Sequence, residues 1–229
     1  MRMLKTLCLT GAILISVSTA GALEEGRSGI GFFGSAHVPI GPFKQWYSVS
    51  PKLGVSYNYT ASQRVIAEVE YHYSNMQGGE LDSREFTWTV DKQNYRSPNA
   101  SQDMWFHSFS AIALVHFRDL NQGGTIPYLQ GGLGFFGYSH EVSGLIFSGQ
   151  TGRTLDETLL LSPYKDKRAA LTFSLGGGVS IVGSEHYVVD IRGRFNIMLG
   201  ELRPLEDWQL RKAFPLQALD LIVGVKYFW

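Results

Sequence analysis

Alternation of apolar and polar residues with a period of two runs through most of this chain and recurs in eight separate stretches. In Arg64–Tyr73, for example, Val, Ala and Tyr occupy one set of alternate positions, and Glu68, Glu70 and His72 occupy the other. Such alternation predicts β-strands with one apolar and one polar face. The eight predicted strands are Ser28–Val38, Pro51–Thr60, Arg64–Tyr73, Met104–Arg118, Ile126–Tyr138, Ala169–Val182, Tyr187–Leu199 and Ala218–Trp229.

These runs are long, and the segments between them alternate between long and short. A soluble strand usually spans about 5–6 residues, whereas a tilted strand needs about 9–11 residues to cross a bilayer, a length that several of the runs reach. Outer-membrane barrels have short periplasmic turns and long outer loops, and an open sheet edge in hydrocarbon would leave backbone groups unpaired. We therefore predict an all-β fold, a closed antiparallel up-and-down transmembrane β-barrel of eight strands.

In such a barrel the apolar face of each strand meets lipid and the polar face lines the lumen. An eight-stranded barrel is only just wide enough for its own side chains, and buried charges must be paired. We therefore predict a network of ion pairs that plugs the lumen, with a narrow path for ions or small solutes as the alternative. The predicted lumen charge network consists of Glu68, Glu70, Asp190, Arg192, Arg194, Asp220 and Lys226.

Aromatic residues lie near the ends of the predicted strands, as expected for the aromatic girdles at the two membrane interfaces. The predicted inner girdle contains Tyr59, Phe117, Tyr128, Tyr187, Tyr227 and Trp229. The predicted outer girdle contains Tyr73, Trp105, Phe106 and Tyr138.

The first residues have the features of an export signal. A positive stretch, MRMLK, precedes the uncharged apolar run TLCLTGAILISV and the small residues that end at Ala22. This order predicts a secretory signal peptide over 1–22, cleaved after Ala22, which leaves 23–229 as one barrel domain. The single cysteine, Cys8, lies within the signal, so the mature chain is predicted to contain no thiol and no disulfide scaffold.

The charge composition excludes one class of partner. The chain has 20 Lys and Arg against 20 Asp and Glu, which gives a formal net charge of +0. A protein that binds nucleic acid non-specifically carries a basic excess, so no nucleic-acid partner is expected. Six scattered histidines give no spacing typical of a metal site, and we expect neither a metal nor a cofactor.

The end of the sequence carries a family resemblance. Apolar residues at alternate positions, with an aromatic residue in the last place, resemble the C-terminal targeting strand of bacterial outer-membrane barrels. The stretch PYLQGGLG at 127–134 is similar to a central strand of small barrels of the OmpA, OmpX and OmpW kind. The resemblance implies residence in the lipid of the bacterial cell outer membrane and recognition by the barrel-assembly machinery. The implied assembly signal consists of Leu221, Val223, Val225, Tyr227 and Trp229.

These observations favour a non-catalytic barrel with a structural or surface-interaction role, in which the loops 74–103 and 139–168 offer a site for an extracellular ligand. A lipid-modifying enzyme would need a serine and a histidine on one face near the outer rim. His107 and Ser108 are adjacent and therefore point to opposite faces, whereas Ser35 and His37 share a face. A soluble periplasmic barrel that binds apolar ligands is the least favoured alternative.

Overall fold

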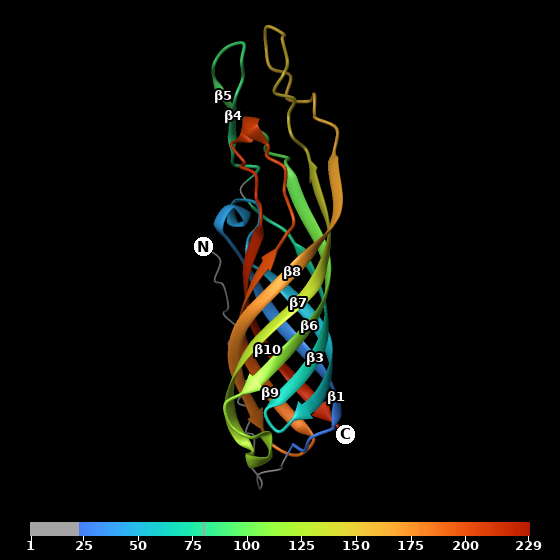
Figure 1. The fold of residues 1–229 in the computed structure, drawn as a ribbon. Coiled ribbons are helices and arrows are strands. Elements are labelled where there is room, and N and C mark those ends of the chain that lie inside the picture. Colours follow the sequence, from blue (N-terminus) through green and yellow to red (C-terminus); the bar gives the residue numbers. More distant parts are fainter. Residues whose placement is uncertain (1–22, 80) are drawn as a thin grey trace, which may run out of the picture.

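The computed structural model describes residues 23–79 and 81–229, so the predicted signal peptide, 1–22, lies outside the described residues. Eight long strands form a closed barrel in the order β1-β10-β9-β8-β7-β6-β3-β2 (Figure 1), which confirms the predicted fold class. The barrel strands are β1 (Ser28–Ile40), β2 (Ser50–Ser62), β3 (Val65–Met76), β6 (Ser101–His116), β7 (Gly124–Ser143), β8 (Tyr164–Val182), β9 (Tyr187–Met198) and β10 (Leu216–Phe228).

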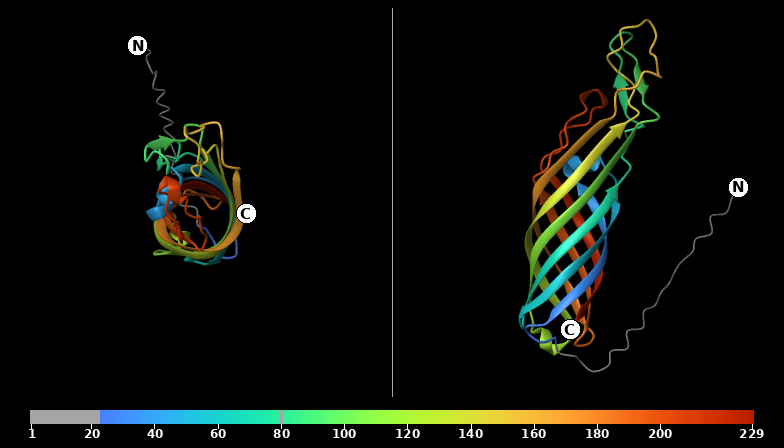
Figure 2. Two further views of the ribbon diagram at one scale, coloured as in Figure 1. Left: turned by 90° about the horizontal axis from the view of Figure 1, so that it is seen from above. Right: turned by 90° about the vertical axis from the view of Figure 1, so that its right-hand side faces the viewer.

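Every neighbouring pair in the barrel is antiparallel, and β1 closes the ring by pairing with β10 from Gly29↔Phe228 to Ile40↔Gln217. Figure 2 shows the closed ring from above and the long connections gathered at one end of the barrel. A separate two-stranded sheet, β4 (Glu85–Thr87) and β5 (Asn94–Arg96), belongs to these outer loops. The short 3-10 helices are η1 (Gly41–Gln45), η2 (Leu120–Gln122) and η3 (Glu206–Trp208).

The predicted loop boundaries 74–103 and 139–168 were too wide. β3 continues to Met76 and β6 begins at Ser101, while β7 continues to Ser143 and β8 begins at Tyr164. Backbone pairing persists through positions such as His140↔Asp166, although many of these side chains are polar or charged. Above the bilayer neither face of a strand must be apolar, so the alternation that marks a membrane strand ends before the strand does.

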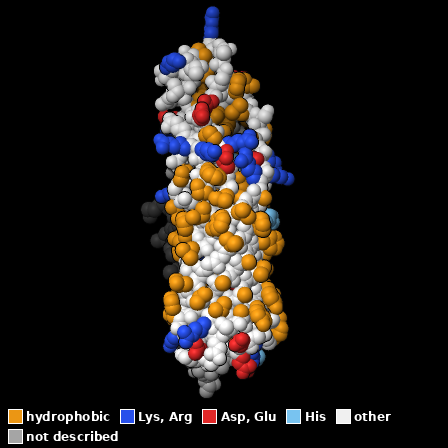
Figure 3. Space-filling model, viewed as in Figure 1, with side chains coloured by type: hydrophobic (Ala, Val, Ile, Leu, Met, Phe, Trp, Pro, Cys, Tyr) orange, Lys and Arg blue, Asp and Glu red, His pale blue; other side chains and the backbone are white. Residues whose placement is uncertain are grey.

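The two faces of the barrel wall have opposite chemistry. Leu53, Phe135 and Leu175 are among the many apolar side chains exposed on the outside. They form a belt between two zones of charged side chains (Figure 3), as a bilayer requires. The inward positions are mostly polar or small. The apolar face of each strand is therefore the outer one and the polar face lines the lumen, as the alternation predicts.

Among residues 23–79 and 81–229, no helix has the length and apolar character needed to cross a membrane.

The aromatic girdles are only partly as predicted. Tyr59, Phe117, Tyr187, Tyr227 and Trp229 are exposed near the inner rim, and Trp105 is exposed near the outer one. The predictions for Tyr128, Phe106 and Tyr138 were wrong, because these three side chains are buried. Each occupies one of the alternate positions of its strand that face inward. This alternation, and not nearness to a rim, decides whether the side chain is buried.

Apolar clusters close both ends of the lumen. The inner cluster includes Leu23, Ile66, Leu114, Val188 and Phe228, all almost completely buried. The outer cluster combines residues of the barrel wall, η1 and the outer loops, and it contains the largest buried aromatic side chains of the protein. The polar part of the lumen lies between these two clusters.

Candidate functional site: the lumen and the outer loops

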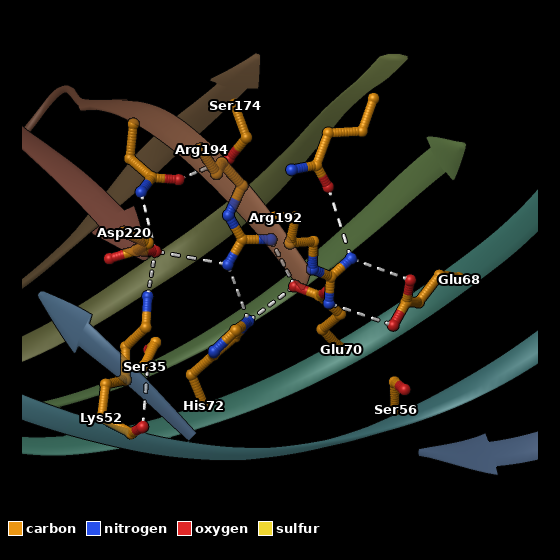
Figure 4. Close-up of polar contacts among 12 residues, drawn as sticks. Ser35, Lys52, Ser56, Glu68, Glu70, His72, Ser174, Arg192, Arg194 and Asp220 are labelled. Atoms are coloured by element: carbon orange, nitrogen blue, oxygen red, sulfur yellow. Dashed lines mark hydrogen bonds and ion pairs between the residues drawn. The ribbon is translucent and has the colours of Figure 1, made fainter. Parts of the chain in front are cut away.

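The structure places all seven residues of the predicted lumen charge network inside the barrel, where none is more than 3% exposed. They come from β3, β9 and β10. In the ring order, β3 and β9 lie on opposite sides of the barrel. Contacts between these two strands therefore span the lumen, as the close-up in Figure 4 shows.

Two arginines from β9 meet the carboxylates of β3. Arg192 lies 3.0 Å from Glu68 through Nη1 and 2.5 Å from Glu70 through Nη2. Arg194 Nη1 lies 2.5 Å from the second oxygen of Glu70. Glu70 is thus held between two guanidinium groups, and it also lies 2.7 Å from His72 Nε2. This arrangement ties opposite walls of the barrel together with charge-assisted hydrogen bonds.

Asp220 on β10 is the second centre of the network. Its carboxylate bonds His37 Nδ1 at 2.6 Å and accepts a 2.9 Å hydrogen bond from Asn196. It also accepts a hydrogen bond from Lys52 and lies 3.4 Å from Arg194 Nη2. Three strands besides β10 therefore converge on one carboxylate.

His37 and Lys52 are missing from the predicted network although both are buried in the lumen. Lys52 stands on the polar side of its strand, opposite the outward-facing Leu53, so the alternation contained the signal that would have found it. His37 shares a strand face with Ser35, but the Ser35 hydroxyl points to the Lys52 carbonyl at 3.4 Å. His37 bonds Asp220 instead.

The remaining members lie toward the inner cluster. Lys226 Nζ is 3.0 Å from Glu68 and 3.2 Å from Asp190. The Tyr128 hydroxyl donates a 2.6 Å hydrogen bond to Asp190, so this tyrosine, predicted for the girdle, is a neutral member of the network.

The buried charges of the described lumen balance. Four carboxylates, on Glu68, Glu70, Asp190 and Asp220, face four cations, on Lys52, Arg192, Arg194 and Lys226. A path for ions of one sign would be lined by an excess of the opposite charge. The equal numbers and the direct contacts instead satisfy the charges within the protein.

Glycines make room for these large side chains. A Cβ on Gly178 would lie 2.6 Å from the Cβ of Arg192, its cross-strand partner on β9. Phe33, an apolar residue on the lumen side, is paired with Gly54 on β2 and Gly224 on β10. The Phe33 ring fills the space that the two glycines leave and lies 5.6 Å from the Arg192 guanidinium carbon.

Little free space remains near the network. A cavity of about 10 Å³ lies beside His37, Lys52 and Arg194, which is enough for about one water molecule. Toward the outside, Phe106 and Phe136 pack with their ring centroids 4.9 Å apart. Phe43 and Trp46 of the η1 region are completely buried above them. The described lumen is therefore filled by charged side chains and covered by aromatic ones.

The outer loops pack on one another rather than extending separately into solvent. Trp88, which follows β4, donates a 2.8 Å hydrogen bond from Nε1 to the carbonyl of Gln150. Its neighbour Phe86 packs against Trp208 of η3 with ring centroids 5.5 Å apart. Segments 77–100, 144–163 and 199–215 therefore share one apolar cluster with the top of the barrel, and we name these three segments together the outer head.

One contact anchors η1 to the strand extension above the apolar belt. The Tyr47 hydroxyl bonds Nδ1 of His140, and both side chains are buried. Burial lowers the pKa of His140 to about 4, although the nearby Asp166 carboxylate acts in the opposite direction. Burial also raises the pKa of Tyr47 well above its usual value. Both groups are therefore neutral at pH 7.

The serine and histidine candidates for catalysis do not meet in the structure. Ser108 points into the lumen, whereas His107 lies outside and bonds the Tyr71 hydroxyl at 2.6 Å. Within the described residues, no group of three or more His, Cys, Asp or Glu side chains is arranged to hold a metal ion.

Comparison with known proteins gives the fold and not a sequence family. No protein-family model and no curated protein matches this chain. The crystal structure of Neisserial surface protein A is similar, with a TM-score of 0.51 and 15% identity over 89% of this chain and 99% of that one. A major outer membrane protein from Thermus thermophilus is also similar, with a TM-score of 0.54 and 10% identity over 88% of this chain and 99% of that one. The chain has the fold of small outer-membrane barrels, as the resemblance in the sequence implies.

Proposed function

We propose that this protein is a non-conducting, non-catalytic barrel of the bacterial outer membrane that presents a preformed surface for interaction outside the cell. The observation that carries the proposal is the closure of the lumen at three levels. The inner apolar cluster, the balanced charge network and the aromatic cover around Phe43 and Trp46 follow one another along the axis.

The outer head supports the second half of the proposal. Its loops share a buried core, so a partner would meet a surface that is already ordered, which lowers the entropic cost of binding. Within it, Phe147 and Leu159 pair through a 2.8 Å backbone hydrogen bond. Phe147, Leu159 and Leu160 are exposed large apolar side chains. Such exposed apolar residues favour contact with another molecule.

Conductance of the refolded protein in a planar lipid bilayer tests the closed lumen. Folding is checked first by the heat-dependent shift in gel mobility that folded barrels show. The protein tested must have passed this check and must also remain associated with the lipid membrane. From such protein we expect no discrete current steps in 1 M salt. Salt-dependent steps of constant size would reject the proposal and favour the alternative of a narrow channel for ions or small solutes.

A further inference from the structure

A separate cleft lies outside the lumen, between η1 and the outer segment that leads to β4. Its volume is about 770 Å³, within the range of about 300–1,000 Å³ that is usual for small-molecule sites. We name it the η1 cleft and define it by Val38, Ile40, Lys44, Val49, Gly79 and Arg84 from its lining.

The described lining of the η1 cleft carries positive charge without a carboxylate. Lys44 of η1 is exposed, and Arg84, just before β4, also lines the cleft. An anionic group in the cleft would accept charge-assisted hydrogen bonds from the Lys44 ammonium and from the terminal N–H groups of Arg84.

The rest of the wall is largely apolar and continues the outer surface of the barrel. Val38 and Ile40 stand at alternate positions of β1, on the outward side that carries the lipid-facing residues. Val49, just before β2, is 60% exposed. Figure 1 shows η1 beside the upper ends of the strands and well below the tips of the outer loops. The η1 cleft therefore joins a cationic region to the outer end of the apolar belt.

We propose that the η1 cleft binds an amphipathic anion with one alkyl chain, either a carboxylate or a phosphate monoester. Lys44 and Arg84 would hold the anionic group, and Val38, Ile40 and Val49 would contact the chain. The volume accommodates one alkyl chain with its anionic group. This site lies outside the lumen, so its test does not depend on the outcome of the test of the proposed function.

Binding of dodecyl phosphate to the refolded full chain in phosphatidylcholine nanodiscs tests the proposal. Backbone amide shifts of Gly41 and Gly79, which line the cleft, report occupancy by NMR. We expect saturable binding of one dodecyl phosphate per barrel. We expect 1-dodecanol, which lacks the anion, and inorganic phosphate, which lacks the chain, to bind at least about tenfold more weakly.

Matched variants locate the site. Lys44→Gln and Arg84→Gln are each expected to weaken dodecyl phosphate binding about tenfold. Lys167→Gln, which removes another exposed cation on β8, is expected to leave it unchanged. Lys44 is exposed, so its variant keeps the test valid even if Arg84→Gln fails to fold.

Three results would overturn the proposal. If Lys44→Gln and Lys167→Gln bound dodecyl phosphate with equal affinity, the charge of Lys44 would have no part in binding. Equal affinity for dodecanol would mean partition of the chain into lipid. Equal affinity for inorganic phosphate would mean a simple anion site.

Discussion

Arg192 shows most directly what single residues contribute to this barrel. Its side chain crosses the lumen and contacts Glu68 and Glu70 on the opposite wall. We expect Arg192→Ala to lower the free energy of unfolding by about 3–5 kcal/mol, because it removes one of four buried cations and leaves an uncompensated negative charge beside Glu68 and Glu70. Urea unfolding of the refolded protein in detergent measures this change, and a lower temperature for the gel-mobility shift should accompany it.

Arg96→Ala is the control for that measurement. Arg96 pairs with Glu85 at 2.6 Å, but both side chains are well exposed. An exposed pair contributes about 0–1 kcal/mol. If Arg192→Ala were no less stable than Arg96→Ala, the charge network would not have a structural role.

Gly54 and Gly34 provide a second test at the residue scale. A Cβ on Gly54 would lie 2.3 Å from the ring of Phe33 and 2.6 Å from the Tyr71 carbonyl oxygen, whereas a Cβ on Gly34 meets nothing nearer than Leu53 at 3.9 Å. We expect Gly54→Ala to cost about 1–3 kcal/mol by overpacking and Gly34→Ala to cost little. The same urea titration compares the two, and equal stability would mean that Phe33 moves aside without penalty.

The sequence reveals which side of the wall a residue occupies, but not its partner across the lumen. Period-two alternation places Glu70 and Arg192 on inward faces. That Arg192 reaches both Glu68 and Glu70 depends on ring closure and on the strand stagger. Tyr128 is an example. Its place among the inward positions of its strand agrees with its contact with Asp190, whereas its nearness to the inner rim predicted a girdle position that it does not occupy.

At the scale of elements, η1 is held in the barrel mouth by a bond that depends on pH. His140 has a pKa of about 4 in the folded protein, below the 6.5 of the free side chain. Between these values the released histidine binds a proton and the buried one does not, so stability is complete above pH 6.5 and is lost as the pH falls toward 4. We therefore expect η1 to loosen over this window.

Hydrogen exchange of segment 41–49, corrected for the intrinsic effect of pH, measures this loosening between pH 7 and 4.5. The turn 89–92, which contains no histidine, serves as an internal reference. In His140→Gln the protection of segment 41–49 should depend on pH less than in the wild type over this range. A wild-type protein with constant protection, or an unchanged dependence in His140→Gln, would contradict the role of His140.

The alternation in the sequence predicts that a strand exists, but it does not predict where the strand ends. All eight barrel strands are evident from alternation, because a wall between lipid and a polar lumen requires it. The outer parts of β7 and β8 have no such requirement, and they were predicted as loop. The outer head could not be predicted either, because Phe86 and Trp208 meet only through contacts between segments far apart in the sequence.

At the scale of the whole molecule, the protein has a polar interior. Its exterior is apolar between two charged zones (Figure 3). Such a surface needs a membrane, and closure of the ring depends on β10 pairing with both β1 and β9. The predicted assembly residues Leu221, Val223, Val225, Tyr227 and Trp229 all face outward from this closing strand and its end. In the folded barrel these five side chains lie on the lipid-facing surface.

Two aromatic residues separate recognition of this strand from simple anchoring in lipid. Trp229 and Phe117 are each 58% exposed, and both lie at the inner rim, but only Trp229 belongs to the predicted assembly signal. Aromatic residues stabilise a barrel at the interface wherever they stand, so anchoring alone predicts similar effects for Trp229→Ala and Phe117→Ala. Recognition of the closing strand predicts that only Trp229→Ala lowers the amount of folded barrel in the outer membrane of expressing cells.

We expect the result that recognition predicts, a loss for Trp229→Ala alone. We expect both purified variants to refold equally well in detergent, because the backbone bond from Trp229 N to the Ser28 carbonyl survives the substitution. Equal losses in cells would reduce the role of Trp229 to that of an interfacial anchor.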